Sequence, residues 1–234
     1  MPTFADARAA VGAHWREKTA WSVAVTTLFC VPYFVLQQLG AAHARTLPST
    51  AIDDAIAFDP AWAWVYQSGY LLMAAVPWLI DRRDDLHRYV VDFLCVSAIG
   101  FAIFLVLPIA GPRPAIVPAG GMYGLLVSYD GPTNAFPSLH VALLTLTTLV
   151  AARASAGRMD AAPRATLIGV ASAWAMLVAF SALATRQHYA VDLPAGAALA
   201  WLVHRLHVLR LLSRRAPRRR VSDSRRSPTC TALE

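Results

Sequence analysis

The stretch TAWSVAVTTLFCVPYFVLQQLGAA, residues 19–42, decides the fold class of this chain. It contains no Asp, Glu, Lys or Arg and exceeds the roughly 20 residues with which an α-helix crosses a bilayer. Hydrophobic residues make up 57% of the chain and charged residues only 15%, whereas soluble domains carry about 25% charged residues. The composition therefore excludes an ordinary water-soluble globule, and it excludes disorder for most of the chain.

Five further apolar stretches follow the first one along the 234 residues. Three of them also lack charge, at 60–80, 93–110 and 165–185. Two shorter ones, at 136–152 and 189–203, carry a histidine or directly follow one. We therefore predict an all-α integral membrane protein, a bundle of six transmembrane helices with both termini in the cytoplasm.

The sequence divides into three predicted parts. Residues 1–18 form a cytoplasmic N-terminal segment, residues 19–212 the six-helix membrane domain, and residues 213–234 a disordered basic tail rich in Arg, Ser and Pro. The net charge is +7, and nine of the 21 basic residues lie between Arg205 and Arg226. A basic tail suits nucleic acid or an anionic membrane surface. In a chain this apolar, we expect it to bind anionic lipids of the inner leaflet and no nucleic acid.

The positions of Lys and Arg predict the orientation, because these residues stay on the cytoplasmic side of a membrane. With six spans, 18 of the 21 basic residues fall on the side of the termini. Only Arg45, Arg113 and Arg186 fall on the other side. We expect a multi-pass protein of the cell (inner) membrane whose sparsely charged side faces away from the cytoplasm.

Chemically active side chains gather on that outer side. They come from the loop at 111–137, from the start of the fourth span and from the short loop before the sixth. Ionisable groups at membrane depth are costly and are functional candidates by default. The candidates are Arg113, Ser138, His140, Arg186, His188 and Asp192.

The spacing of these residues indicates phosphate chemistry. Pro137-Ser138 is a plausible helix start with the serine as N-cap, so His140 would lie in the first turn. Helix N-termini favour anions and bind phosphate. His188 and Asp192 are four residues apart and would share a helix face. The carboxylate can then orient one imidazole nitrogen and leave the other free to attack.

The remaining candidates complete a phosphoryl-transfer site. His140 can protonate a leaving group, and Arg113 and Arg186 can hold phosphate oxygens in a bidentate way. The set predicts transfer through a phosphohistidine. No third ligand with metal spacing accompanies His188 and Asp192, so we expect neither a metal ion nor another cofactor.

These residues resemble the signature of the type 2 phosphatidic acid phosphatase superfamily of membrane lipid phosphatases and phosphotransferases. Arg113-Pro114 is similar to the end of its first motif, and Pro137–His140 to its second motif with Leu139 in place of Gly. His188 and Asp192 are similar to the end of the third motif, and Ser181 falls where its serine would. The resemblance implies a six-span core and metal-independent catalysis.

The resemblance also implies a role for each matched residue. His188 would attack phosphorus, Asp192 would orient it, and His140 would protonate the departing alkoxide and then activate the acceptor. Three groups would bind phosphate oxygens: Arg113, Arg186 and Ser138.

Two cationic residues of the signature are missing from this chain. Val106 stands where the first motif has lysine, and Ala182 where the third has arginine. Arg186 would replace one of them. The wordings F-P-S-L-H and T-R-Q-H-Y-x-x-D-L look more like the branch with inositol phosphorylceramide synthases and sphingomyelin synthases, which move a phospho-headgroup between lipids.

Three functions follow as alternatives. The first is a lipid phosphatase or phosphotransferase, the second a catalytically inactive relative that binds lipids, and the third a structural membrane protein. We favour hydrolysis over transfer, because the chain is short and shows no second headgroup site. Phosphatidic acid, phosphatidylglycerol phosphate, an isoprenyl pyrophosphate and a sphingolipid all remain possible substrates, and the oligomeric state stays open.

Overall fold

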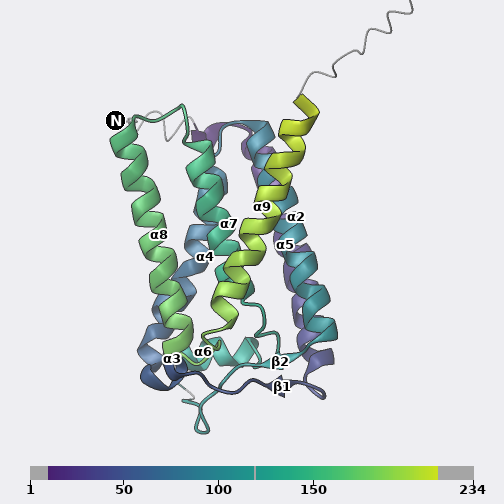
Figure 1. Cartoon of the computed structure of the whole chain (residues 1–234), viewed down its shortest axis with the longest axis vertical. Helices are drawn as coiled ribbons and strands as arrows, with labels where there is room; N and C mark the ends of the chain where they lie inside the picture. Colours follow the sequence, from purple (N-terminus) through teal and green to yellow (C-terminus); the bar gives the residue numbers. More distant parts are fainter. Residues whose placement is uncertain (1–9, 119, 216–234) are drawn as a thin grey trace, which may run out of the picture.

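Long helices lying side by side form the body of the protein in the computed structural model, which describes residues 10–118 and 120–215 (Figure 1). They are α2 (Trp15–Gly40), α4 (Ala63–Trp78), α5 (Arg83–Val106), α7 (Leu139–Ala154), α8 (Ala161–Ala184) and α9 (Asp192–Arg215). Short elements lie at one end of this bundle: β1 (Arg45–Thr46), α3 (Ala51–Ala55), η1 (Pro60–Trp62), β2 (Ile109–Ala110) and α6 (Gly121–Tyr129).

Each long helix overlaps one predicted span, so the prediction of an all-α bundle is confirmed at this level. By length and composition, α2, α5 and α8 could each cross a membrane, and α7 is a shorter apolar helix. The number of six crossings therefore stays a prediction. One detail was not predicted: β1 and β2 form a two-stranded parallel pair with Arg45 opposite Ile109.

The helix ends differ from the predicted span ends. Helix α5 begins at Arg83, ten residues before the charge-free stretch starts at Phe93. Asp84 and Asp85 lie in its first turn, where negative charge stabilises a helix N-terminus. Helix α2 begins at Trp15 and α9 continues to Arg215. The absence of charge thus marks the apolar part of each helix, whereas the helix itself extends into its charged flanks.

Helix α7 occupies the centre of the bundle. It packs against α9, α8, α5 and α4, and most of its side chains are buried, among them Ala142, Leu143 and Leu146. Helix α2 lies at the edge, where it packs on α5 through aromatic contacts such as Phe29 with Phe93 and Phe101. Because α2 touches α4 at few points, the space between these two helices stays partly unfilled.

The outer connection at 111–137 is folded and not an open loop as the sequence suggested. It contains α6, which packs against α4 and η1. The amide of Ala135 donates to the carbonyl of Ile109 at 3.0 Å, and Gly111 donates to Pro132 at 2.7 Å. These bonds hold the two ends of the connection together below the bundle.

The described chain starts and finishes at the same end of the bundle, opposite α3, α6 and the strands (Figure 1). This arrangement fits the predicted placement of both termini on one side. Residues 1–9 and 216–234 lie outside the described residues. Three expectations therefore stay predictions: the disorder of the basic tail, its binding to lipids and the division of the chain into three parts.

Candidate active site

The beginnings of α7 and α9 meet at the end of the bundle where α3 and α6 lie, and they bring the second and third motifs together. The amide of Ser138 donates to the carbonyl of Asp192 at 3.1 Å. Gly196 in the first turns of α9 faces the carbonyl of Ser138, and a Cβ at this glycine would lie only 2.2 Å from that oxygen. The absence of a side chain at Gly196 thus allows the two helix starts to approach this closely.

His188 has a defined orientation in this junction. Its Nδ1 lies 2.9 Å from the carbonyl oxygen of Ala135 and 3.3 Å from Oδ2 of Asp192. Both partners are acceptors, so Nδ1 carries the proton and Nε2 presents a lone pair. The Ser138 hydroxyl, 3.1 Å from Nε2, donates to it. Ser138 Oγ in turn accepts from the amide of Val141, which confirms the predicted N-cap of α7.

Asp192 is fully buried beside His188. Its Oδ2 accepts from the amide of Tyr189 at 2.8 Å in addition to the imidazole, and its Oδ1 has no partner among the described residues. The reason for the contact differs from the predicted one. His188 lies in the loop before α9, and Asp192 is the first residue of that helix, so the pair does not share a helix face.

His140 lies in the first turn of α7, as predicted, and is held by aromatic rings of α4. Its ring stacks on Tyr66 with centroids 4.3 Å apart and meets Tyr70 edge-on at 4.8 Å. Its Nε2 is buried without a hydrogen-bond partner among the described residues. A Cβ at Gly69 would lie 2.5 Å from this nitrogen, so the glycine leaves the space that the imidazole occupies.

The two predicted arginines contact backbone carbonyls. Arg113 donates through Nη2 to Asp130 at 2.8 Å and to Gly131 at 3.3 Å, and its buried Nε lacks a partner among the described residues. Arg186, which adopts a left-handed backbone conformation with φ 54°, donates to the carbonyls of Asp53 and Ile56 at 2.9 Å each. Their binding of phosphate stays a prediction.

Helix α3 forms a brace for the loop that carries His188. Thr50 and Asp53 form a capping box, and the buried Asp53 carboxylate also accepts from the amide of Ala190 at 2.8 Å. Burial by itself would raise the pKa of Asp53. Hydrogen bonds from Thr50 and Ala190 and the charge of Arg186 outweigh burial and hold that pKa below its usual value.

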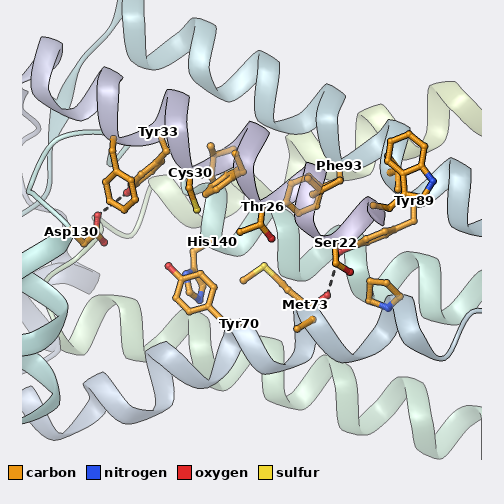
Figure 2. A pocket seen from close by; sticks show the side chains of 18 of the residues that line it. Ser22, Thr26, Cys30, Tyr33, Tyr70, Met73, Tyr89, Phe93, Asp130 and His140 are labelled. Atoms are coloured by element: carbon orange, nitrogen blue, oxygen red, sulfur yellow. Dashed lines mark hydrogen bonds between the residues drawn. The ribbon is translucent and has the colours of Figure 1, made fainter. Parts of the chain in front are cut away.

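A cavity of about 480 Å³ extends from the two histidines into the bundle (Figure 2). Near its outer end, Tyr33 donates to Oδ1 of Asp130 at 2.8 Å, and Asn134 donates to the Tyr33 carbonyl at 3.1 Å. Asp130 is buried, which raises the pKa of its carboxyl group, while the Tyr33 bond and the charges of Arg113 and His188 oppose this effect. His140 and His188 both line this cavity.

The structure thus brings four of the six predicted site residues together and adds others that sequence reasoning missed. His140 and His188 line the head of the cavity, and Ser138 and Asp192 contact His188 behind it. Arg113 and Arg186 lie in the loops nearby and bind backbone carbonyls there. The additional residues are Tyr33, Tyr66, Tyr70, Asp130 and Asp53. A signal existed for two of these, because Tyr66 and Tyr70 are four residues apart on one helix.

The spacing Thr50-x-x-Asp53 was a second signal, since it is typical of a helix N-terminus. Nothing in the sequence linked this helix to the distant residues 186–190.

Over the described parts of the chain, His, Cys, Asp and Glu side chains form no group of three or more that could hold a metal ion.

Fold and site together define a class, a multi-pass helical membrane protein with a histidine-based site at one end of its bundle. The family model described as the PAP2 superfamily matches residues 35–206, and the chain belongs to this superfamily. Its members are phosphatases and phosphotransferases that act on phosphorylated substrates, and they generally need no metal. No individual curated protein matches the chain.

Proposed function

We propose that this protein is a membrane lipid phosphatase that works through a phosphohistidine at His188. The observation that carries the proposal is the orientation of His188. Its Nδ1 proton is bound by Ala135 and Asp192, so the Nε2 lone pair faces the Ser138 hydroxyl and the head of the cavity. An imidazole held in this tautomer by a carboxylate is a prepared nucleophile.

The first half of the reaction forms the covalent intermediate. Nε2 of His188 attacks the phosphorus of a phosphomonoester, the Ser138 hydroxyl having rotated away, and the bond from phosphorus to the lipid oxygen breaks. Protonated His140 gives its proton to that leaving oxygen, so a lipid alcohol departs. Asp192 stabilises the positive charge that develops on the His188 ring.

The second half returns the enzyme to its starting state. Neutral His140 takes a proton from the incoming water, whose oxygen attacks the phosphorus as the bond from phosphorus to Nε2 breaks. Inorganic phosphate then leaves. A lipid hydroxyl in place of water would give a new phospholipid, the reaction of the synthase branch that the motif wording resembles. Hydrolysis remains the favoured proposal for this short chain.

Phosphate binding falls to donors around the head of the cavity. The amides in the first turn of α7 form a helix N-terminus, which favours anions. The unpartnered Nε of Arg113 supports a role for this residue, which a small movement of its loop would bring to a phosphate. Both guanidinium Nη atoms of Arg186 hold α3, which favours positioning of the His188 loop over direct phosphate contact.

The charge distribution supports a site on the extracytoplasmic face. Its substrate would then be a phosphorylated headgroup of the outer leaflet in the cell membrane. Water and the leaving phosphate would exchange with the outer solution, while the lipid part of the substrate stays in the bilayer.

The test is an assay of detergent-purified protein in EDTA with a panel of lipid phosphates, with and without a lipid alcohol. Release of phosphate and formation of new phospholipid are both followed. We expect His188→Ala to abolish turnover while its thermal unfolding stays close to that of the wild type. His43→Ala, which removes an exposed histidine at the same end of the molecule, is the matched control and should stay active.

The outcomes separate the alternatives. Phosphate release that depends on His188 supports the phosphatase, and new phospholipid without phosphate release identifies a phosphotransferase. Full activity of His188→Ala would reject the phosphohistidine. If no lipid of the panel gave phosphate release or new phospholipid, an inactive lipid-binding relative would be favoured.

A further inference from the structure

The cavity at the active site is much deeper than a phosphate needs. It begins at His140, His188 and Asp130 and ends at Lys18, near the opposite end of the bundle. On α2 its wall runs from Tyr33 to Lys18, which at 1.5 Å per residue is about 22 Å. Figure 2 shows the same extent, from Tyr33 and Asp130 at one end to Tyr89 and Phe93 at the other.

The lining of the cavity suits a hydrocarbon chain. Beyond the histidines the wall is mainly apolar and aromatic, with Phe29, Met73, Tyr89 and Phe93 along it.

The cavity opens sideways between α2 and α4. Ser22 and Thr26 on α2 and Ala74 on α4 line it and are nevertheless exposed. Because these two helices touch at few points, the opening faces the surface of the bundle that lipid would cover. A chain can therefore enter from the bilayer without first leaving it.

The inner end of the cavity is closed by a polar group. Lys18 is buried, and its Nζ donates to the carbonyls of Ala10 at 2.7 Å and Trp78 at 2.8 Å. An ammonium group tied to the backbone is a poor neighbour for a terminal methyl group. The floor at Lys18 therefore sets a limit on how far a hydrocarbon chain can penetrate.

We propose that this cavity binds a hydrocarbon chain of the substrate, and that its depth selects chains reaching beyond one leaflet. The inference rests on the proposed function, which places the phosphate at the histidines. Half of a hydrocarbon core is about 15 Å, so a chain that fills about 22 Å from the outer headgroup passes the midplane. Substrates whose chain reaches along the whole cavity make packing contacts with its wall that shorter ones lack.

The test uses a plug in the middle of the cavity. Thr26 and Thr27 are both exposed, but Thr26 points into the cavity (Figure 2), whereas Thr27 does not line it. Thr26→Trp and Thr27→Trp are compared with the wild type in mixed micelles, with decyl phosphate and octadecyl phosphate as probes. The readout is the ratio of kcat/KM for the longer over the shorter probe.

We expect the wild type and Thr27→Trp to prefer octadecyl phosphate. Thr26→Trp should lower the ratio about tenfold, since every methylene kept out of the cavity loses its packing contacts with the wall. Decyl phosphate should still be hydrolysed by Thr26→Trp. Equal ratios in all three proteins would overturn the inference while leaving the proposed function intact.

A second measurement works even without turnover. Octadecyl phosphate with a photoreactive diazirine at the chain end is cross-linked to the His188→Ala protein, and the labelled peptides are identified by mass spectrometry. Label on the inner-end residues Trp78, Leu86 or Tyr89 supports the inference, and Thr26→Trp should remove it. Label confined to lipid-facing residues outside the cavity would reject it, whether or not the wild type releases phosphate.

Discussion

At the scale of single residues, the orientation of His188 depends on groups that converge from distant parts of the sequence. The carbonyl of Ala135 and the carboxylate of Asp192 both accept from Nδ1, while Ser138 reaches Nε2. Because the amide of Tyr189 also binds Oδ2, the carboxylate is fixed before any substrate arrives. Of the groups that contact the ring, Asp192 is the one that carries a negative charge.

Asp192→Asn tests this dependence directly. The amide oxygen can still accept from Tyr189, but the negative charge that stabilises a positively charged imidazole is lost. We expect kcat to fall by about 10²-fold or more, with KM changing far less, measured as phosphate release from the best substrate of the panel. If KM rose while kcat stayed constant, Asp192 would instead be assigned to substrate binding.

At the scale of elements, the packing of α4 on α7 positions His140. Tyr66 and Tyr70 enclose the ring, and Gly69 between them leaves room for Nε2. The helix is thus shaped around an imidazole that has no hydrogen-bond partner among the described residues at this nitrogen. In the proposed reaction, that arrangement would leave the nitrogen available for a proton transfer.

Gly69→Ala should therefore damage catalysis more than stability. Its new methyl group would displace the His140 ring, and we expect kcat to fall by about 10²-fold, the usual contribution of a general acid. The matched control is Gly169→Ala in the middle of α8, where a Cβ meets nothing within 4 Å. The control should keep full activity and gain about 1 kcal/mol of helix stability. Equal activity of both variants would show that the space at Gly69 is irrelevant to the reaction.

Helix α3 allows a prediction about pH. The Asp53 carboxylate accepts bonds from Thr50 and from Ala190. Its pKa is lowered in the folded state, so its contribution to stability is fully present above the unfolded value of about 4 and is lost as pH falls through the folded pKa. Asp53→Ala should cost about 1–3 kcal/mol at neutral pH, because buried donors lose their acceptor.

The measurement is thermal unfolding in detergent at several pH values. The difference in Tm between wild type and Asp53→Ala should shrink as the pH falls below about 4. Asp54→Ala, an exposed neighbour, serves as the control and should behave like the wild type. A Tm difference that is independent of pH would show that the carboxylate charge does not stabilise this brace.

The elements also show what the sequence could and could not predict. Apolar stretches located all six long helices, and Pro137-Ser138 located the start of α7, because both signals are local. The bonds from Arg186 to α3 and from Tyr33 to Asp130 join residues about 130 and 97 positions apart. No local pattern reports such pairs, so the role of Arg186 in holding α3 became visible only in the structure.

The contacts of Asp92, a buried residue of α5, could not be predicted from the sequence either. Arg88 and Asp92 are four residues apart on α5, a spacing typical of an ion pair on one helix face. In the structure, Asp92 is buried and binds Nδ1 of His204 at 2.9 Å and of His207 at 2.5 Å, which joins α5 to α9. Spacing along α5 identified a neighbour on the same helix, whereas packing supplied partners from another one.

At the scale of the whole molecule, the bundle separates a site end from a charged end. The site, α3 and α6 lie at one end, and the turn between α7 and α8 lies at the other together with the ends of the described chain (Figure 1). With 18 of 21 basic residues assigned to the charged end or its extensions, the positive-inside rule predicts that the site faces away from the cytoplasm.

Cysteine labelling tests this orientation. Ile116, which is 86% exposed beside the site, and Ala156, exposed in the turn between α7 and α8, are each changed to Cys after Cys30, Cys95 and Cys230 are replaced by Ala. A membrane-impermeant maleimide on intact cells should label Ile116→Cys, whereas Ala156→Cys should react only after lysis. Equal labelling of both in detergent is the control for reactivity.

The reverse labelling pattern would have a mechanistic consequence. His188 would then meet headgroups of the inner leaflet, and a chain in the cavity would extend from there toward the outer one. The expected pattern instead places the phosphate-releasing end of the cavity outside and Lys18 near the cytoplasmic interface. A positive charge at that position agrees with the side on which lysine and arginine are retained, so Lys18 supports the same orientation as the basic residues of the loops and the tail.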